Sequence, residues 1–279
     1  MTVQLTTSDL LARGTAALAP VLEWPSLDAG ILLAFSLGIA RVRLKSHPEE
    51  PRSAAELQRY LALIARRAQG EPLAYITGVR EFWTLELRVT RDVLVPRPES
   101  ELLVERGIAL GGPAHAQVLD LGTGSGAIAL ALACERPAWE VVAVDDSPAA
   151  LAVARDNGRR LGLANVTFTA SDWFAALRGR RFDLVVANPP YIDARDPALS
   201  DLGHEPRRAL TPGEDGLADL RTIIGAAPGH LLPGGWLALE HGSTQAAAVA
   251  HELVARGFGS VRSHRDLTGH ERVTEGQWP

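Results

Sequence analysis

The sequence predicts an α/β protein in which a doubly wound α/β domain follows a small helical domain and a β-hairpin linker. From residue 117 onward, short runs rich in Val and Leu alternate with alanine-rich runs at helical spacing. Strands that are apolar throughout are typical of a parallel sheet covered by helices on both faces. Before residue 70, apolar residues recur only at helical spacing, which predicts a separate helical domain.

Leucine and alanine runs predict the helices of the amino-terminal domain, which we place at residues 1–75. These runs cover residues 8–18, 26–44 and 53–68. Ser53 and Glu56 open the third run with the Ser-x-x-Glu pattern of a capping box, in which each side chain satisfies a backbone N–H at the start of a helix.

The hydrophobic period changes over residues 81–89, where EFWTLELRV alternates like a strand. The following residues, 90–92, suit a turn before DVLVPRP, so we expect a β-hairpin linker over residues 76–97. Residues 99–110 return to helical spacing, and the Gly-Gly-Pro that follows is expected to end that helix. The α/β domain then spans residues 98–279.

Continuous apolar runs predict the strands of the α/β domain. They cover residues 118–122, 140–145, 165–171, 182–188 and 234–242. Ligands of doubly wound sheets bind at the carboxyl ends of the strands, near the point where the strand order reverses. The residues that follow these strands are therefore the candidate functional residues.

Composition narrows the class of partner and the compartment. The 279 residues carry a net charge of −5, so no global positive field attracts a nucleic-acid backbone, and we expect no nucleic-acid partner. The single cysteine, Cys134, has no intramolecular disulfide partner, and no signal-peptide pattern opens the chain. The apolar run at residues 31–40 is about half as long as a membrane span requires. We expect a cytoplasmic protein with no membrane attachment.

A glycine-rich turn, DLGTGSG, follows the first strand of the α/β domain. Gly122, Gly124 and Gly126 let the backbone approach a ligand closely and present N–H donors at the start of a helix. The same residues also satisfy a dinucleotide fingerprint, and a tight turn with no ligand remains an alternative.

Polar and aromatic residues at the next two strand ends favour an adenosine ligand. Asp145 ends the second strand, at about the spacing from the glycines at which a carboxylate reaches ribose hydroxyls. Asp172 and Trp173 follow the third strand, where an acid can accept from an adenine amino group and an indole ring can cover the base. A purely structural role for Trp173 is the alternative.

The fourth strand ends in VVANPPYI, residues 185–192, which places a carboxamide before two prolines. The side-chain oxygen of Asn188 and the main-chain oxygen of Pro189 can each accept an N–H from a planar amide or amine. Pro190 stiffens the turn and Tyr191 can pack on the planar group. A planar nitrogen is a poor nucleophile, so orientation toward an activated methyl donor such as S-adenosyl-L-methionine is the help that it needs.

NPPY after DLGTGSG resembles the class I methyltransferases that modify planar amide or amine nitrogens. Further segments resemble the release factor glutamine methyltransferase family, also called protein-(glutamine-N5) methyltransferases. These segments are VLVPRPESE (93–101), SDWF (171–174), HEPRRALTPGEDGL (204–217), LLPGGWLALEHGSTQ (231–245) and RVTEG (272–276). The resemblance covers essentially the whole chain and implies a Rossmann-like methyltransferase domain.

The resemblance implies methyl transfer from S-adenosyl-L-methionine to the glutamine N5 of the Gly-Gly-Gln motif in class I peptide chain release factors, which tunes translation termination. The product is S-adenosyl-L-homocysteine. The implied cofactor-binding residues are Gly122, Thr123, Gly124, Ser125, Gly126, Asp145, Asp172, Trp173 and Asn188. The implied catalytic and substrate-binding residues are Asn188, Pro189, Pro190 and Tyr191.

Other roles follow from the same resemblance. Arg97 and Glu99, together with Glu101, would close the site from the hairpin side. The amino-terminal domain would recognise the partner protein, and we expect a monomer. From their position alone, Glu240 and His241 at the end of the fifth strand could form an acid/base pair, but we interpret them as part of a structural turn. The histidines show no metal-ligand spacing, so we expect no metal.

Two other functions stay open at this point. An NPPY methyltransferase that acts on DNA adenine or ribosomal RNA guanine would use the same geometry. A non-catalytic module that only binds S-adenosyl-L-methionine would use the same cofactor residues.

Overall fold

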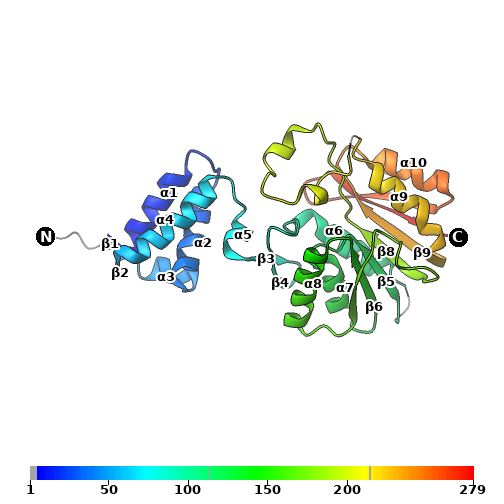
Figure 1. Ribbon diagram of the computed structural model, residues 1–279, viewed down its shortest axis with the longest axis horizontal. Coiled ribbons are helices and arrows are strands. Elements are labelled where there is room, and N and C mark those ends of the chain that lie inside the picture. The colour runs from blue at the N-terminus through cyan, green and yellow to red at the C-terminus, as the bar shows by residue number, and fades with distance from the viewer. Residues whose placement is uncertain (1–4, 113, 214) are drawn as a thin grey trace. The chain divides into compact units, whose positions relative to one another are not determined.

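The fold combines a helical amino-terminal unit with a larger α/β unit (Figure 1). The computed structural model describes residues 5–112, 114–213 and 215–279. The first unit ends at Gly78 and the second runs from Val79 to Pro279. None of the described helices has the length and the apolar character that crossing a membrane requires.

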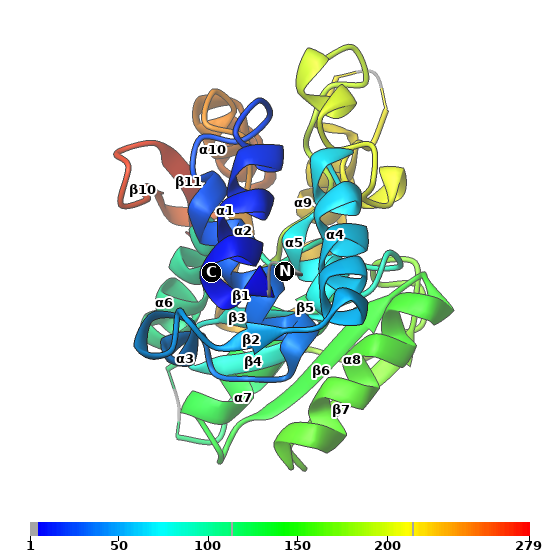
Figure 2. The same ribbon diagram turned by 90° about the vertical axis from the view of Figure 1, so that its left-hand side faces the viewer.

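Helices build the amino-terminal unit, which Figure 2 shows most clearly. They are α1 (Thr7–Leu18), α2 (Pro25–Leu37), α3 (Arg41–Ser46), α4 (Ala54–Ala68) and α5 (Leu73–Thr77), beside the short strands β1 (Leu5–Thr6) and β2 (Pro51–Arg52). The predicted capping box begins α4, because Ser53 Oγ accepts from Glu56 N and Glu56 Oε2 accepts from Ser53 N. Helices α1, α2 and α4 pack around the buried side chains of Leu10, Leu33 and Tyr60.

The single helix predicted over residues 26–44 is wrong, because α2 ends at Leu37 and α3 begins at Arg41. Gly38 adopts φ 64°, a left-handed conformation that glycine reaches without the steric cost of a side chain. Its N–H caps the last turn of α2 by donating to the main-chain oxygen of Phe35 at 3.2 Å. Leucine spacing continues across this break, which is why periodicity alone did not reveal it.

The predicted strand over residues 81–89 is also wrong in its bounds, since the hairpin turn lies inside it. The hairpin consists of β3 (Val79–Phe82) and β4 (Leu85–Arg88), paired antiparallel. Trp83 occupies the turn at φ 55°, an uncommon angle for a non-glycine residue. Its N–H donates to Glu101 Oε1 at 2.8 Å, so a distant carboxylate stabilises a turn that contains no glycine or asparagine.

A seven-stranded sheet forms the centre of the α/β unit, in the order β10-β11-β9-β8-β5-β6-β7. Its strands are β5 (Gln117–Leu121), β6 (Glu140–Asp145), β7 (Val166–Ala170), β8 (Phe182–Ala187), β9 (Leu231–Glu240), β10 (Gly259–Arg265) and β11 (Glu271–Gln277). Its helices are α6 (Glu101–Leu110), α7 (Ala127–Glu135), α8 (Pro148–Leu161), α9 (Ala218–Ala226) and α10 (Ala246–Arg256). The five predicted strands are present and pair in parallel.

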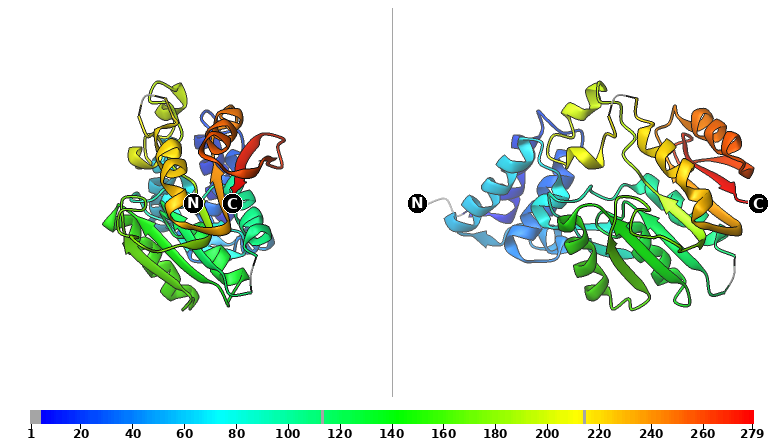
Figure 3. Two further views of the ribbon diagram at one scale, coloured as in Figure 1. Left: turned by 90° about the vertical axis from the view of Figure 1, so that its right-hand side faces the viewer. Right: turned by 45° about the vertical axis from the view of Figure 1, so that its right-hand side comes forward.

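Side chains alternate between two apolar cores, one on each face of the sheet. Figure 3 shows that helices cover both faces. Val118 and Leu184 point to the face covered by α6 and α7, whereas Leu119 and Val185 point to the face covered by α9 and α10. Both faces are therefore buried, as the continuous apolar strands predicted. The doubly wound α/β fold class is confirmed.

The last two strands, β10 and β11, were not predicted because they are not apolar. They pair antiparallel with each other, and β11 pairs antiparallel with β9. Glu275 on β11 is 2% exposed and forms a two-pronged ion pair with Arg106 on α6. A strand that carries a charge can thus be buried when that charge has an ion-pair partner. A hydrophobicity pattern does not reveal such a partner.

The strand order reverses between β5 and β8, since β5 pairs with β6 on one side and with β8 on the other. The glycine-rich turn follows β5, and Asn188 follows β8. Both segments therefore lie at the carboxyl edge of the sheet, at its topological switch point.

Candidate active site

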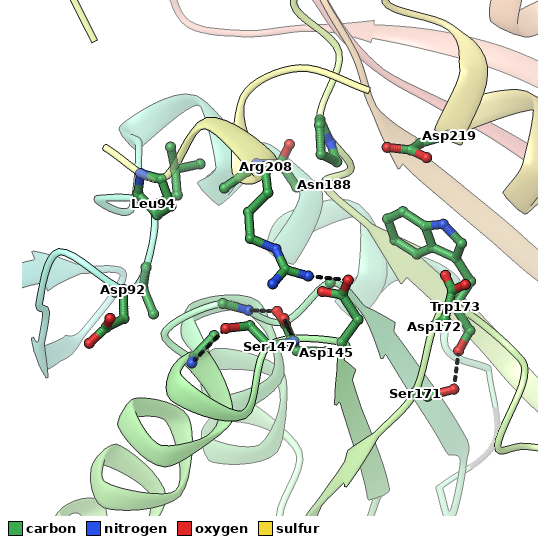
Figure 4. A pocket seen from close by; sticks show the side chains of 18 residues that line it. Asp92, Leu94, Asp145, Ser147, Ser171, Asp172, Trp173, Asn188, Arg208 and Asp219 are labelled. Atoms are coloured by element: carbon green, nitrogen blue, oxygen red, sulfur yellow. Dashed lines mark hydrogen bonds and ion pairs between the residues drawn. The ribbon is translucent and has the colours of Figure 1, made fainter. Parts of the chain in front are cut away.

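A cavity of about 240 Å³ opens at this switch point (Figure 4). The residues that line it come from the ends of β5, β6, β7 and β8, from residues 92–94 after the hairpin, from the segment around residue 208 and from the start of α9. Among those predicted from the sequence, the cavity is lined by Gly122, Gly124, Asp145, Asp172, Trp173, Asn188 and Pro190. The structure thus brings the ends of four successive parallel strands around one space.

The glycine-rich turn has a conformation that depends on glycine. Gly122 has φ 70° and Gly124 has φ 54°, and a Cβ atom on Gly122 would lie 3.4 Å from the Trp173 ring. Thr123 and Ser125 are buried and do not line the cavity. Thr123 Oγ1 donates to Asp120 Oδ2 at 2.6 Å, so it braces the turn from behind.

Gly126 likewise has a conformational role and does not line the cavity. It precedes α7 at φ 87°, and a Cβ atom there would lie 2.9 Å from a Leu130 methyl group. Its role in this structure is to start α7 close to the sheet.

Asp145 fixes the relative positions of two loops at the cavity floor. Its Oδ2 accepts from Gly124 N at 2.9 Å and its Oδ1 accepts from Ser147 N at 2.8 Å. Burial raises the pKa of Asp145, and the hydrogen bonds from Ser147 and Gly124 oppose that effect. Each carboxylate oxygen keeps a second lone pair, so the side chain has acceptor capacity left for a ligand hydroxyl.

Trp173 forms one wall of the cavity and has an unusual backbone angle, φ 44°. Asp219 lines the same cavity, and its pKa is raised by burial and then by the negative charges of Asp172 and Asp146. The indole ring of Trp173 faces the cavity (Figure 4). This arrangement can cover a flat aromatic ligand.

The cavity is strongly acidic. Its carboxylates are Asp92, Asp145, Asp146, Asp172 and Asp219, and Arg208 is the one cationic residue among the described residues that line it. Arg208 forms an ion pair with Asp146, so its charge is already matched. A cationic ligand fits this lining, whereas the pyrophosphate of a dinucleotide would meet mainly negative charge.

A second cavity, of about 270 Å³, lies on the other side of Asn188. Its lining includes the predicted residues Arg97, Glu99, Asn188, Pro189 and Tyr191. The structure therefore brings the carboxamide turn and the hairpin side of the site together, as the resemblance implied.

Asn188 lines both cavities, together with Leu94 and Ala209. Its Nδ2 donates to Ser100 Oγ at 3.0 Å, which leaves the side-chain oxygen Oδ1 without a protein donor among the described residues. Pro190 lines the first cavity, whereas Pro189 and Tyr191 line the second. A group bound in one cavity can thus meet a group bound in the other at Asn188.

The second cavity holds a buried carboxyl that we interpreted from the sequence as part of a structural turn. Glu240 is 1% exposed, and its Oε1 accepts from the Tyr191 hydroxyl at 3.3 Å. Burial raises the pKa of Glu240 to about 7. His241, by contrast, is held by Thr274 at 2.7 Å and by the main-chain oxygen of Gly242 at 2.9 Å, which is the structural role expected of it.

A salt bridge that the sequence did not reveal anchors the wall of the second cavity. Glu205 is buried, forms an ion pair with Arg97 and accepts from Val95 N at 3.0 Å. Glu205 and Arg208 both belong to the HEPRRAL segment, so the family resemblance marked the segment without assigning their partners. Glu101 lines neither cavity and instead holds the hairpin turn, contrary to the role that we expected.

Asn157 connects the hairpin to the glycine-rich turn. It is 1% exposed, and its Nδ2 donates to the main-chain oxygens of Arg88 and Ser125, each at 2.9 Å. Its Oδ1 accepts from Arg88 N at 2.7 Å. As for metals, no cluster of His, Cys, Asp and Glu within the described ranges could hold an ion.

Comparisons with known proteins place the chain in a family. Residues 9–78 match the model of the PrmC N-terminal domain, and residues 98–217 match the methyltransferase small domain. A protein of Burkholderia pseudomallei named release factor glutamine methyltransferase is 53% identical over 263 residues, which cover 91% of this chain and 92% of that protein. The Escherichia coli protein of the same name is 44% identical, with coverage of 92% and 93%.

Solved structures agree with the fold. A methyltransferase from Pyrococcus furiosus has a TM-score of 0.55 and 21% identity, and covers 76% of this chain and 96% of its own length. A Thermus thermophilus 16S rRNA methyltransferase, solved with AdoMet and guanosine, has a TM-score of 0.53 and 24% identity, with coverage of 72% and 50%. The relatives at 44% to 53% identity carry the assignment. The chain belongs to the release factor glutamine methyltransferase family.

Proposed function

We propose that this protein transfers a methyl group from S-adenosyl-L-methionine to the side-chain amide nitrogen of the glutamine in the Gly-Gly-Gln motif of class I peptide chain release factors. The observation that carries the proposal is the position of Asn188, a carboxamide that lines two adjoining cavities in a chain of this family. Because release factors act on ribosomes, we expect the reaction to take place in the cytoplasm.

The first cavity fits S-adenosyl-L-methionine. Asp145 would hold the ribose hydroxyls, Trp173 would cover the adenine, and the backbone at Gly122 and Gly124 would receive the methionine part. The carboxylates of the lining match the positive charge of the ligand. The bound cofactor supplies a methyl group that is already activated by its sulfonium centre.

The second cavity fits the acceptor amide. Asn188 Oδ1 would accept one N–H of the glutamine amide and the main-chain oxygen of Pro189 the other, which turns the nitrogen lone pair toward the first cavity. Tyr191 would pack on the planar amide. As the nitrogen gains a carbon, it becomes positive and its N–H groups become stronger donors, so both acceptors bind the transition state better than the substrate. The proton leaves the nitrogen afterwards.

The release factor is larger than the second cavity, so recognition needs further surface. We propose that the amino-terminal unit, together with the loop around Arg97 and Glu205, provides it. The match of residues 9–78 to a domain model characteristic of this family supports the first part of this proposal. The wall position of the Arg97–Glu205 ion pair supports the second.

Incorporation of labelled methyl groups tests the function. Purified class I release factor is incubated with the enzyme and labelled S-adenosyl-L-methionine, beside a release factor in which the motif is changed to Gly-Gly-Ala. Label on the first protein alone is the expected result. Label on both proteins would show that the acceptor is another residue and would overturn the proposed position.

The same assay with DNA or with ribosomal RNA in place of the release factor decides between the alternatives. In each reaction the Asn188→Ala enzyme serves as the matched control, since it keeps the other residues of the cofactor cavity but lacks the acceptor oxygen. Label in DNA or ribosomal RNA, and none in the release factor, would favour the nucleic-acid alternative. Bound cofactor without label on any of these substrates would favour a non-catalytic module.

A further inference from the structure

Glu240 is a buried carboxyl at the edge of the second cavity whose hydrogen-bonding capacity is not fully used. Its Oε2 is buried and has no hydrogen-bond partner in the part of the chain that the structure describes. Glu275, on the adjacent strand β11, is equally buried, yet Arg106 donates to both of its oxygens. A carboxyl that serves stability alone is normally satisfied, as Glu275 is.

Two polar side chains beside Glu240 belong to the proposed acceptor site. The Tyr191 hydroxyl donates to Oε1 at 3.3 Å. Ser100 lies near the same carboxyl, and like Tyr191 it counteracts the effect of burial on the pKa of Glu240. Ser100 is 4% exposed and stands at the start of α6, next to the turn that holds Asn188.

The number of protons on each group decides which side chain donates and which accepts in these contacts. Asn188 Nδ2 donates to Ser100 Oγ, so the single hydroxyl proton of Ser100 must point elsewhere. The nearby Glu240 Oε2, a buried acceptor without a partner among the described residues, is available for that proton when the carboxyl is ionised. When the Asn188 NH₂ group donates to Ser100, the Asn188 side-chain oxygen is left to accept an N–H from the substrate amide.

We propose that Glu240 is a positioning residue that acts through Ser100 to fix the orientation of the Asn188 carboxamide, and through the Tyr191 hydroxyl to fix the ring that packs on the substrate amide. This inference rests on the proposed function of the site. Rotated by half a turn, Asn188 would present its NH₂ group to the N–H groups of the glutamine, and two donors would oppose each other.

Glu240→Gln is the direct test, because glutamine keeps the shape and adds a donor. With a release factor as substrate, kcat is expected to fall by roughly 10-fold to 100-fold, the loss of about 1.4 to 3 kcal/mol of transition-state stabilisation. The KM for the release factor and the calorimetric affinity for S-adenosyl-L-methionine are expected to stay within about twofold, since other residues of the two cavities hold both ligands in the proposed complex. A kcat within about twofold of the wild type would overturn the proposal.

Ser100→Ala provides a second variant at a site where a small side chain becomes slightly smaller. Because Ser100 and Glu240 act along one path, the double variant should lose less than the product of the two single losses, by roughly fivefold or more. If the two single losses of kcat simply multiply in the double variant, the two residues act independently, and the proposed action of Glu240 through Ser100 is wrong. Glu275→Gln is the matched control on the adjacent strand, and its kcat should equal that of the wild type.

The wild-type reaction separates this inference from the proposed function. If the wild type methylates the Gly-Gly-Gln release factor and Glu240→Gln does so equally fast, only the role of Glu240 is wrong. If the wild type does not methylate it under conditions where cofactor binds, the proposed function is wrong and the inference falls with it.

Discussion

Glu240→Gln is expected to stabilise the folded protein at pH 8 by up to about 3 kcal/mol, although it lowers activity. Burial raises the pKa of Glu240 from its ordinary 4.5 to about 7. Each pH unit between these two values corresponds to about 1.4 kcal/mol of proton-linked free energy, which gives the total of about 3 kcal/mol. Ionisation of a carboxyl that is 1% exposed is therefore costly, and glutamine does not ionise.

The sign follows from the direction of the pKa change. Since the folded protein binds this proton more tightly than the unfolded chain, the proton-linked stability of Glu240 is complete below pH 4.5 and is lost as the pH rises through 7. The variant lacks this loss. At pH 5 the free energies of unfolding of the two proteins should thus differ little, and at pH 8 the variant should be the more stable.

Urea unfolding at pH 5 and pH 8 measures the difference, followed by tryptophan fluorescence. Of the six tryptophans, all but Trp24 lie in the α/β unit, so the signal reports mainly on the unit that contains Glu240. Subtraction of the wild-type curve removes other titrations, including that of Asp120, whose pKa burial also raises to about 7. An equal difference between variant and wild type at both pH values would refute the reasoning.

Other substitutions test separate parts of the site. Asn188→Ala should lower kcat by roughly 100-fold or more while calorimetry gives an unchanged cofactor affinity; a normal kcat would contradict its role. Asp145→Ala should weaken S-adenosyl-L-methionine binding by about 10-fold to 100-fold, and an unaltered dissociation constant would contradict the ribose contact. Asn157→Ala removes the three hydrogen bonds described above, so the free energy of unfolding should fall by about 3 kcal/mol in urea titrations; a loss below about 0.5 kcal/mol would show that the tie is unimportant. Gly14→Val places a Cβ atom 1.8 Å from the Tyr60 hydroxyl. It should disrupt the amino-terminal unit and abolish methylation of whole release factor but not of a short Gly-Gly-Gln peptide, whereas equal loss on both would argue against a recognition role.

Much of the α/β unit could be predicted because burial on both faces leaves a strong signal. The five parallel strands are apolar throughout, and the functional residues follow them directly, so Gly122, Asp145 and Asn188 could be placed at one edge from order alone. The carboxamide before two prolines was informative because two prolines remove two backbone N–H donors at the end of a buried strand, which indicates a functional reason for the turn.

The residues that were missed owe their positions to tertiary contacts. The hairpin turn at Trp83 depends on Glu101, which lies in a helix 18 residues further on. Glu240 was interpreted together with His241 as part of a turn at a strand end, since the sequence does not tell which of two adjacent side chains faces a cavity. The buried carboxylate of Glu205 is stabilised by Arg97 and by the N–H of Val95, which lie about 110 residues earlier in the sequence.

Among the described residues, the two cavities share three that line both, Leu94, Asn188 and Ala209, and this thin partition has a consequence for inhibitor design. One compound that joins an adenosine to a primary carboxamide through a short flexible tether could occupy both sides at once. Binding of the first half would raise the local concentration of the second half, so the affinities would reinforce each other. Selectivity would come from the carboxamide end, because the adenosine end alone would also suit other enzymes that use the same methyl donor.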